Sequence, residues 1–152
     1  MEEHIMADRI NASVFGEVLA NGLALGVIVM DQSYRIVLWN HWMEKHSGIR
    51  EADIIGENIL EKFPDIQQRG KEQYLIECFE NRKPLILSPF IHGYLIPLDI
   101  IKENTTHRML QDVRIYPLFD NNEVIATIII IKDLTEQILH EKEIVRLTRI
   151  LK

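Results

Sequence analysis

The segment Val124–Lys132 (VIATIIIIK) constrains the fold more than any other part of this chain. Its four consecutive isoleucines, residues 128–131, lack the alternation of apolar and polar side chains that a half-exposed strand shows. A strand that is apolar on both sides is covered on both faces, which places it inside a sheet rather than at its edge. The sequence therefore predicts a central strand with one layer of structure on each side.

This strand continues directly into a predicted helix, residues 134–152. The side chains of Asp133 and Thr135 can bond backbone groups where the strand becomes a helix. Apolar residues, among them Ile138 and Val145, then recur in a broken heptad pattern. About two and a half heptads are too few for a stable coiled coil on their own. We therefore expect the helix to pair in a homodimer and to continue into an output domain.

The chain begins with a predicted amphipathic helix, followed by a hairpin. Residues 8–21 carry apolar side chains at helical spacing, including Val14 and Val18. This helix packs on its own domain, where it would cover the second face of the sheet, or forms a dimer contact, or does both. Gly26–Asp31 and Arg35–Asn40 are rich in β-branched residues and flank a polar turn, which predicts two paired strands.

Short helices are predicted in the middle of the chain. Asn40 is expected to cap the first of them, at residues 41–46. Asn58 has the spacing of a capping box with Glu61, which predicts a second helix start. A longer helix is expected over Gln67–Asn81.

The second half is predicted to be mainly β structure. Residues 85–98 are apolar but interrupted by prolines and a glycine, which is typical of an irregular segment or an edge strand. Residues 100–107 are expected to form a polar loop. Residues 109–118 predict a strand with Val113 and Ile115 on one face. Hairpins on both sides of a helical middle imply an α+β fold, with an antiparallel sheet and helices on one face.

Composition excludes several classes of function. The 152 residues carry a net charge of −6, so there is no basic field to attract nucleic acid. No apolar run approaches the ~18 residues of a membrane-spanning helix, and the N-terminus lacks the features of a signal peptide. We expect a cytoplasmic protein whose segment makes no membrane contact. Cys78 is the only cysteine, which excludes an internal disulfide and a cysteine-based metal cluster.

Motifs of known catalytic sites are missing from the sequence. There is no glycine-rich phosphate loop, no nucleophile elbow and no pair of zinc-binding histidines. His140-Glu141 has the first letters of a histidine-kinase phosphoacceptor box, but Lys142-Glu143 departs from that pattern. We therefore expect a regulatory domain without catalytic residues or a bound metal.

Four segments, in order, resemble a PAS domain: GVIVMDQ at 26–32, RIVLWN at 35–40, HSGIREADIIGENI at 46–59 and IIIIKDLTEQ at 128–137. The last resembles the family's final strand and its Asp-Ile-Thr signature, here Asp133-Leu134-Thr135. The resemblance implies a five-stranded antiparallel sheet with a pocket between its inner face and the short helices. Residues 87–107 are longer and richer in proline than a minimal PAS connection.

The resemblance also implies an organisation for signalling. An N-terminal helix (1–23) would precede the sensor domain (24–136), and residues 137–152 would begin a signalling helix. That helix would pass the state of the domain to a histidine kinase, on the same chain or as a partner, or else to a diguanylate cyclase. The candidate relay residues are Asn40, Asp133 and Thr135.

The sequence leaves open whether the core contains a ligand cavity. Period-2 spacing puts Arg35, Val37 and Trp39 on one strand face, without saying whether this face points inward. Large apolar side chains either line a cavity for a small apolar or aromatic ligand or fill the core of an interaction module. The candidates are Trp39, Trp42, Phe63, Tyr74, Cys78, Phe79, His92, Met109, Val113 and Ile115.

Haem is the cofactor most worth testing, because it needs an axial ligand that faces an apolar pocket. Haem-binding PAS domains commonly carry a histidine on the long helix, and the matching helix here, 67–81, has none. His92 and Cys78 are the remaining candidates, although a structural role is the simpler interpretation of both. A covalent flavin is not expected, because Cys78 lies in Ile-Glu-Cys-Phe-Glu rather than in an Asn-Cys-Arg-like motif.

Overall fold

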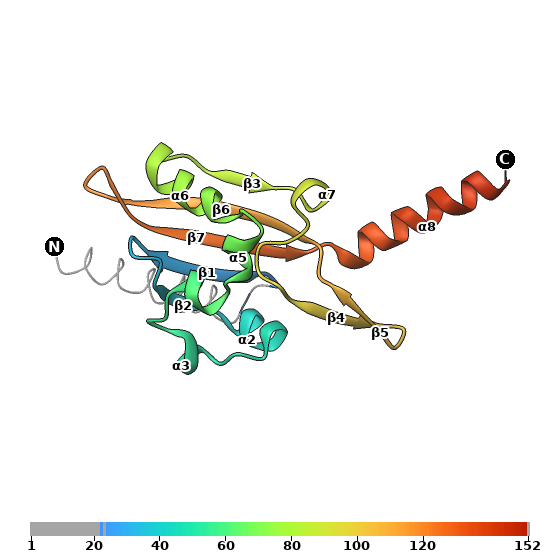
Figure 1. Ribbon diagram of the computed structural model, residues 1–152, viewed down its shortest axis with the longest axis horizontal. Coiled ribbons are helices and arrows are strands. Elements are labelled where there is room, and N and C mark those ends of the chain that lie inside the picture. The colour runs from blue at the N-terminus through green and yellow to red at the C-terminus, as the bar shows by residue number, and fades with distance from the viewer. Residues whose placement is uncertain (1–21, 23, 152) are drawn as a thin grey trace, which may run out of the picture.

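A computed structural model describes residues 22 and 24–151 (Figure 1). The predicted N-terminal helix, with Val14 and Val18, lies outside these residues.

The centre of the fold is a five-stranded antiparallel sheet in the order β2-β1-β7-β6-β3. The strand with four isoleucines, β7, is the middle one, as its apolar character on both faces predicted. Figure 1 shows it crossing the domain and leading into α8. The α+β class and the five-stranded antiparallel sheet are thus confirmed. The strands are β1 (Gly26–Asp31), β2 (Ile36–Trp39), β3 (Leu85–Leu87), β6 (Gln111–Asp120) and β7 (Glu123–Asp133).

Helices from the middle of the chain pack on one face of this sheet, and the core lies between the two layers. Ile129 and Ile131 point into this core, whereas Ile128 and Ile130 on the opposite face are only partly buried. The helices are α2 (His41–Ser47), α3 (Glu51–Ile54), α4 (Ile59–Lys62), α5 (Asp65–Gln68), α6 (Glu72–Asn81), α7 (Pro89–His92) and α8 (Thr135–Leu151).

Local sequence signals for caps and turns are confirmed. The side chain of Asn40 accepts a hydrogen bond from the backbone of α2, and that of Asn58 does the same for α4. Asn121 and Asn122 form the β6–β7 turn with positive φ angles of 48° and 66°, a conformation that asparagine tolerates.

The prediction of one helix over Gln67–Asn81 is wrong in the first turn of that range. The chain instead forms α5 and then α6, separated at Gly70, whose φ of 68° is incompatible with a continuing right-handed helix.

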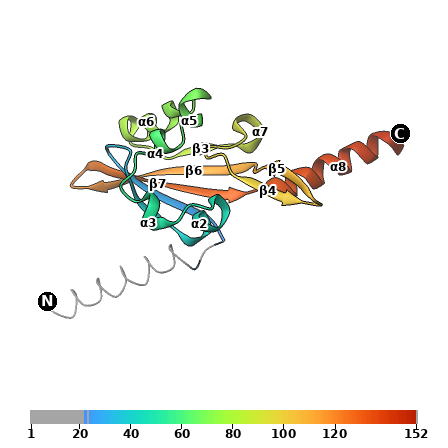
Figure 2. The same ribbon diagram turned by 60° about the horizontal axis from the view of Figure 1, so that its bottom comes forward.

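The prediction of a polar loop at residues 100–107 is also wrong. This region is a second hairpin, β4 (Asp99–Lys102) and β5 (Thr105–Arg108), joined by a two-residue turn. Glu103 and Asn104 both have positive φ, which fits the twist of a tight hairpin. We call residues 88–110, which run from β3 to β6 and include this hairpin, the β3–β6 connector. Figure 2 shows the hairpin at the end of the domain from which α8 leaves.

Candidate functional site: the core and the strand-to-helix junction

The junction between β7 and α8 is held by a small set of polar contacts. Asp133 Oδ1 accepts hydrogen bonds from the backbone N–H of Thr135 at 2.9 Å and from its hydroxyl at 2.6 Å. Thr135 Oγ1 in turn accepts from the backbone N–H of Leu110 at 2.8 Å, and Leu134 N–H donates to the carbonyl of Leu110 at 2.9 Å. The first turn of α8 is therefore fastened to the residue that precedes β6.

Asn40 holds the other strand-to-helix junction, between β2 and α2. Its Oδ1 accepts from the N–H groups of Val27 at 3.1 Å and Met43 at 3.2 Å, and its Nδ2 donates to the carbonyl of Leu25 at 2.8 Å. A single buried amide thus caps a helix and ties it to β1.

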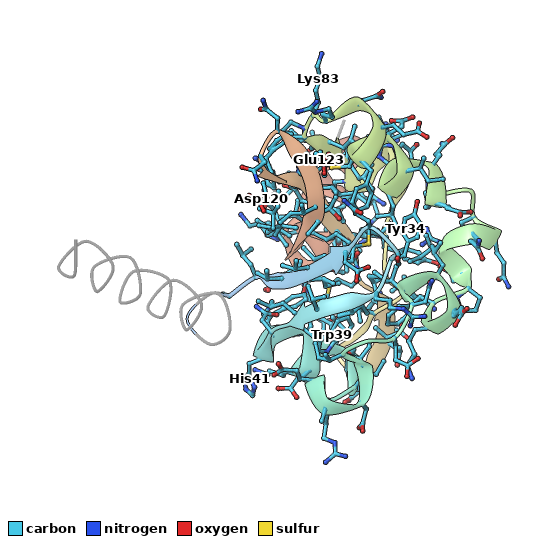
Figure 3. All side chains as sticks on the ribbon, turned by 90° about the vertical axis from the view of Figure 1, so that its left-hand side faces the viewer. Tyr34, Trp39, His41, Lys83, Asp120 and Glu123 are labelled. Atoms are coloured by element: carbon cyan, nitrogen blue, oxygen red, sulfur yellow. The ribbon has the colours of Figure 1, made fainter. Side chains whose placement is uncertain are left out.

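The structure gathers nearly all of the pocket candidates around one core. Six of them are buried members of it: Trp39, Phe63, Cys78, Met109, Val113 and Ile115. Trp42, Tyr74 and Phe79 pack against these residues and are partly buried. Figure 3 shows Trp39 inside the domain, whereas His41 and Lys83 lie at its surface.

The simple alternation expected for β2 does not hold. Ile36 and Trp39 are both buried, while Val37 between them is 50% exposed. The pairing of β1 with β2 shifts register between Val29 and Met30, and this irregularity lets two residues of opposite parity face inward. Trp39 stacks on Phe63 at 6.1 Å between ring centroids.

The sequence did not reveal how the β3–β6 connector contributes to the core. Leu95, Ile96 and Leu98 are almost completely buried between the sheet and the helices. The side chain of Gln111, on β6, bonds this segment. The sequence contains one indication of this contact. Gln111 shares the inward face of its strand with Val113 and Ile115, and a buried glutamine needs hydrogen-bond partners.

Arg69 fastens the same segment from the helical side. Its guanidinium donates to the carbonyls of Tyr94 at 2.8 Å and Leu95 at 2.9 Å, and to the carboxylate of Asp65 at 2.6 Å. It also lies over the Tyr94 ring, 3.7 Å from the centroid, and Arg108 lies 5.0 Å from that centroid. The connector is thus anchored by charge-assisted and cation–π contacts.

The two haem-ligand candidates are engaged in other interactions. His92 Nδ1 lies 3.2 Å from the carbonyl oxygen of Ser88, and its ring packs edge-on against Tyr74 at 5.2 Å. Burial raises the pKa of the Cys78 thiol to about 11, so it remains protonated and a poor ligand at neutral pH. The Ser88 contact involves only Nδ1 and is compatible with ligation through Nε2 of His92, so of the two candidates the buried, protonated Cys78 is the poorer one. In residues 22 and 24–151, no cluster of three or more histidine, cysteine or acidic side chains could hold a metal ion.

The exit helix changes character along its length. Ile138 is 3% exposed and packs on its own domain, whereas Val145 is 51% exposed. Four more apolar residues of its last two turns are also exposed: Ile144, Leu147, Ile150 and Leu151. A hollow of about 600 Å³ lies between this helix and Phe90 of α7. Of the two dimer candidates on α8, Val145 is therefore the accessible one.

Comparison with known proteins identifies the family. A family model described as PAS domain matches residues 24–136, which is most of the chain. The chain belongs to the PAS domain family. PAS domains are regulatory sensory modules and are generally non-catalytic. No curated protein matches the sequence. Within the described part of the chain, no helix is long and apolar enough to cross a bilayer.

Solved structures of other PAS domains share the fold. A PAS domain from Colwellia psychrerythraea aligns with a TM-score of 0.61 at 14% identity, covering 82% of this chain and 98% of that one. A sensory box sensor histidine kinase from Vibrio cholerae gives 0.59 at 20% identity, covering 89% and 99%. The PAS domain of the quorum-sensing receptor RpfR from Cronobacter turicensis, in complex with C12:0, gives 0.53 at 17% identity, covering 74% and 96%.

Proposed function

We propose that this PAS domain is an input module that relays its state through α8 to an output domain. The observation that carries the proposal is the junction: the central strand β7 is followed after Leu134 alone by α8. A shift of β7 against the core would be passed directly to the first turn of α8, because Asp133 and Thr135 join the two elements by hydrogen bonds.

The output that we propose is a histidine kinase, on the same chain or as a partner, with a diguanylate cyclase as the alternative. The structural similarity to the Vibrio cholerae sensor kinase supports the first choice only at the level of fold. The module would act as a cytoplasmic homodimer. The exposed apolar residues on the last two turns of α8 support the dimer, because a helix of this length needs a partner to bury such residues.

Insertions in α8 of the intact protein, with its output domain, test the relay. One extra residue after Leu139 rotates everything beyond it by about 100°, whereas seven extra residues restore the helical phase to within ~20°. We expect the first to change autophosphorylation, or cyclic dinucleotide synthesis for a cyclase, at least severalfold, and the second to preserve signal control. An output that is the same in both variants would contradict a relay through α8.

A second candidate is an interaction module that senses no small molecule. The filled core favours it, because the connector residues Leu95, Ile96 and Leu98 fill space between the sheet and the helices. A ligand would have to displace them. The RpfR PAS domain, solved in complex with C12:0, makes an apolar molecule the first kind of ligand to test. Native mass spectrometry of protein purified from cells distinguishes the two candidates: a retained small-molecule mass supports the sensor. Repeated absence, together with no thermal shift across a metabolite panel, supports the interaction module.

Haem binding is a third alternative, with His92 rather than the buried Cys78 as its candidate ligand. Protein produced with added haem tests it by absorption spectroscopy. A Soret band that is lost in His92→Ala would revive the hypothesis, and the absence of any band would end it.

A further inference from the structure

A buried glutamine joins the β3–β6 connector to the sheet. Gln111 is 1% exposed, and its Oε1 accepts hydrogen bonds from the N–H groups of Leu95 at 3.0 Å and Ile96 at 3.4 Å. Its Nε2 donates to the carbonyl of Ile96 at 2.7 Å. One side chain thus satisfies three backbone groups inside the core, where an unpaired group would be costly.

The segment held in this way, Tyr94–Leu98, is tethered from two directions. Gln111 bonds it from the sheet, and Arg69 bonds the carbonyls of Tyr94 and Leu95 from the helical layer. Arg69 is in turn oriented by Asp65. Hydrogen bonds on both sides keep the apolar side chains of the segment in the core.

The chain where the connector meets β6 also contacts the start of α8. The N–H of Gln111 donates to the carbonyl of Gly93 at 2.8 Å, and Gln111 is the strand partner of Asp133. Its neighbour Leu110 bonds Thr135 Oγ1 and Leu134 N–H. Gln111 therefore bonds the rest of the connector, and its neighbour Leu110, the last residue of the connector, bonds the β7–α8 junction.

We propose that Tyr94–Leu98 is a built-in occupant of the core whose position is coupled to α8 through Leu110 and Gln111. With the segment seated, Gln111 fixes the beginning of β6 and Leu110 supports the first turn of α8. When the segment leaves the core, Gln111 loses its partners, and the same two residues loosen the junction. The inference deepens the proposed function, since it names what moves, but the coupling itself is a property of the domain alone.

Amide hydrogen exchange on the whole chain tests the coupling. Gln111→Met keeps a side chain of similar size and removes all three hydrogen bonds. We expect exchange to become about tenfold faster or more at Tyr94, Leu95, Ile96 and Leu98, as the loss of a net stabilisation near 1.4 kcal/mol implies. The amides of 134–139 should accelerate as well, whereas those of β1 should not. Gln73→Met, at an exposed position on α6, is the matched control and should change neither segment.

Coupling must be reciprocal, so a change at the junction should reach the connector. Thr135→Val removes the hydroxyl that accepts from Leu110 N–H, and we expect faster exchange at residues 94–98 in this variant. Thr135→Ser keeps the hydroxyl and should restore protection there. Should Gln111→Met fail to fold, Arg69→Met releases the same segment from the helical side and should accelerate exchange at 94–98 and 134–139 alike.

Two outcomes overturn the inference. If exchange in Gln111→Met rises only at residues 94–98, Gln111 holds this segment but does not couple it to α8. If exchange is unchanged in both segments, Gln111 does not hold the segment either. Either result would leave the relay through α8 to be judged by the helix insertions. Conversely, exchange could rise in both segments while the insertions in α8 leave the output unchanged. This result would support the coupling between Tyr94–Leu98 and α8 and would refute the relay proposed as the function.

Discussion

The two strand-to-helix junctions of this domain are held by similar hydrogen bonds but differ in what they connect. At β2–α2, the amide of Asn40 bonds β1 and its own helix, and α2 stays in the domain with Met43 buried in the core. At β7–α8, Asp133 bonds Thr135, Thr135 bonds the connector residue Leu110, and α8 then leaves the domain. One junction closes on the sheet, whereas the other depends on a segment that is distant in sequence. The comparison separates a structural cap from a cap that can carry a signal.

The largest expected effect comes from breaking the first junction. Asn40→Ala removes the cap of α2 and leaves the buried N–H of Val27 and the partly buried carbonyl of Leu25 without this partner. We expect a loss of about 2–3 kcal/mol in the free energy of unfolding, measured by urea denaturation. Asn40→Asp keeps the acceptor oxygen but sets a second oxygen against the Leu25 carbonyl in a buried site, so it should also lose stability. If the two junctions differ as described, the Asn40 variants should speed up hydrogen exchange in α8 no more than their loss of global stability accounts for.

Thr135→Val should have a smaller effect on stability and a larger one on α8. The variant removes one hydroxyl that both donates to Asp133 and accepts from Leu110, so we expect a loss of about 1–2 kcal/mol in the free energy of unfolding. Hydrogen exchange in the first turn of α8 should accelerate more than in α2. Equal changes in the two helices would erase the distinction between the junctions.

Asp133→Asn should be milder still. The amide retains an oxygen that can accept from Thr135 N–H and from its hydroxyl, so we expect a loss of about 0.5–1 kcal/mol in the free energy of unfolding. Asp133→Ala removes the acceptor and should approach Thr135→Val. If Asp133→Asn loses as much unfolding free energy as Asp133→Ala, the negative charge, rather than the geometry of the junction, holds α8.

Val145→Glu should leave the stability of the domain almost unchanged, within about 0.5 kcal/mol, because this side chain is exposed. It should instead weaken dimerisation, which sedimentation over a range of concentrations measures. Gln137→Glu, at an exposed polar position on the same helix, also adds one negative charge and is the control. A chain that remains monomeric at high micromolar concentration, even without substitution, would refute the homodimer.

Local patterns in the sequence predicted much of the fold. The two-sided apolar run at residues 128–131 placed β7 in the centre of the sheet, and Asn40 and Asn58 marked helix starts. The alternation at Val113 and Ile115 identified the inward face of β6. Each of these signals is carried by residues that are close together in the chain.

The features that sequence reasoning missed depend on distant residues. Arg69 meets Tyr94 and Leu95 across 25 and 26 positions, and Gln111 reaches back 15 and 16 positions to Ile96 and Leu95. Periodicity does not reveal such pairs. The β4–β5 hairpin was hidden for a different reason, since its strands have only four residues each and do not alternate apolar with polar side chains, and its turn, Glu103-Asn104, lacks a glycine.

The anchoring of the connector has a consequence for protein engineering. Residues 88–110 look like a loop that could be transplanted into another PAS domain as a single piece. Their contacts, however, include Arg69 in the helical layer, Gln111 in the sheet and Thr135 at the start of α8, all outside that piece. A graft without these three partners would carry apolar residues into a host that cannot hold them, and would tend to aggregate. The transferable unit is therefore a discontinuous set of residues.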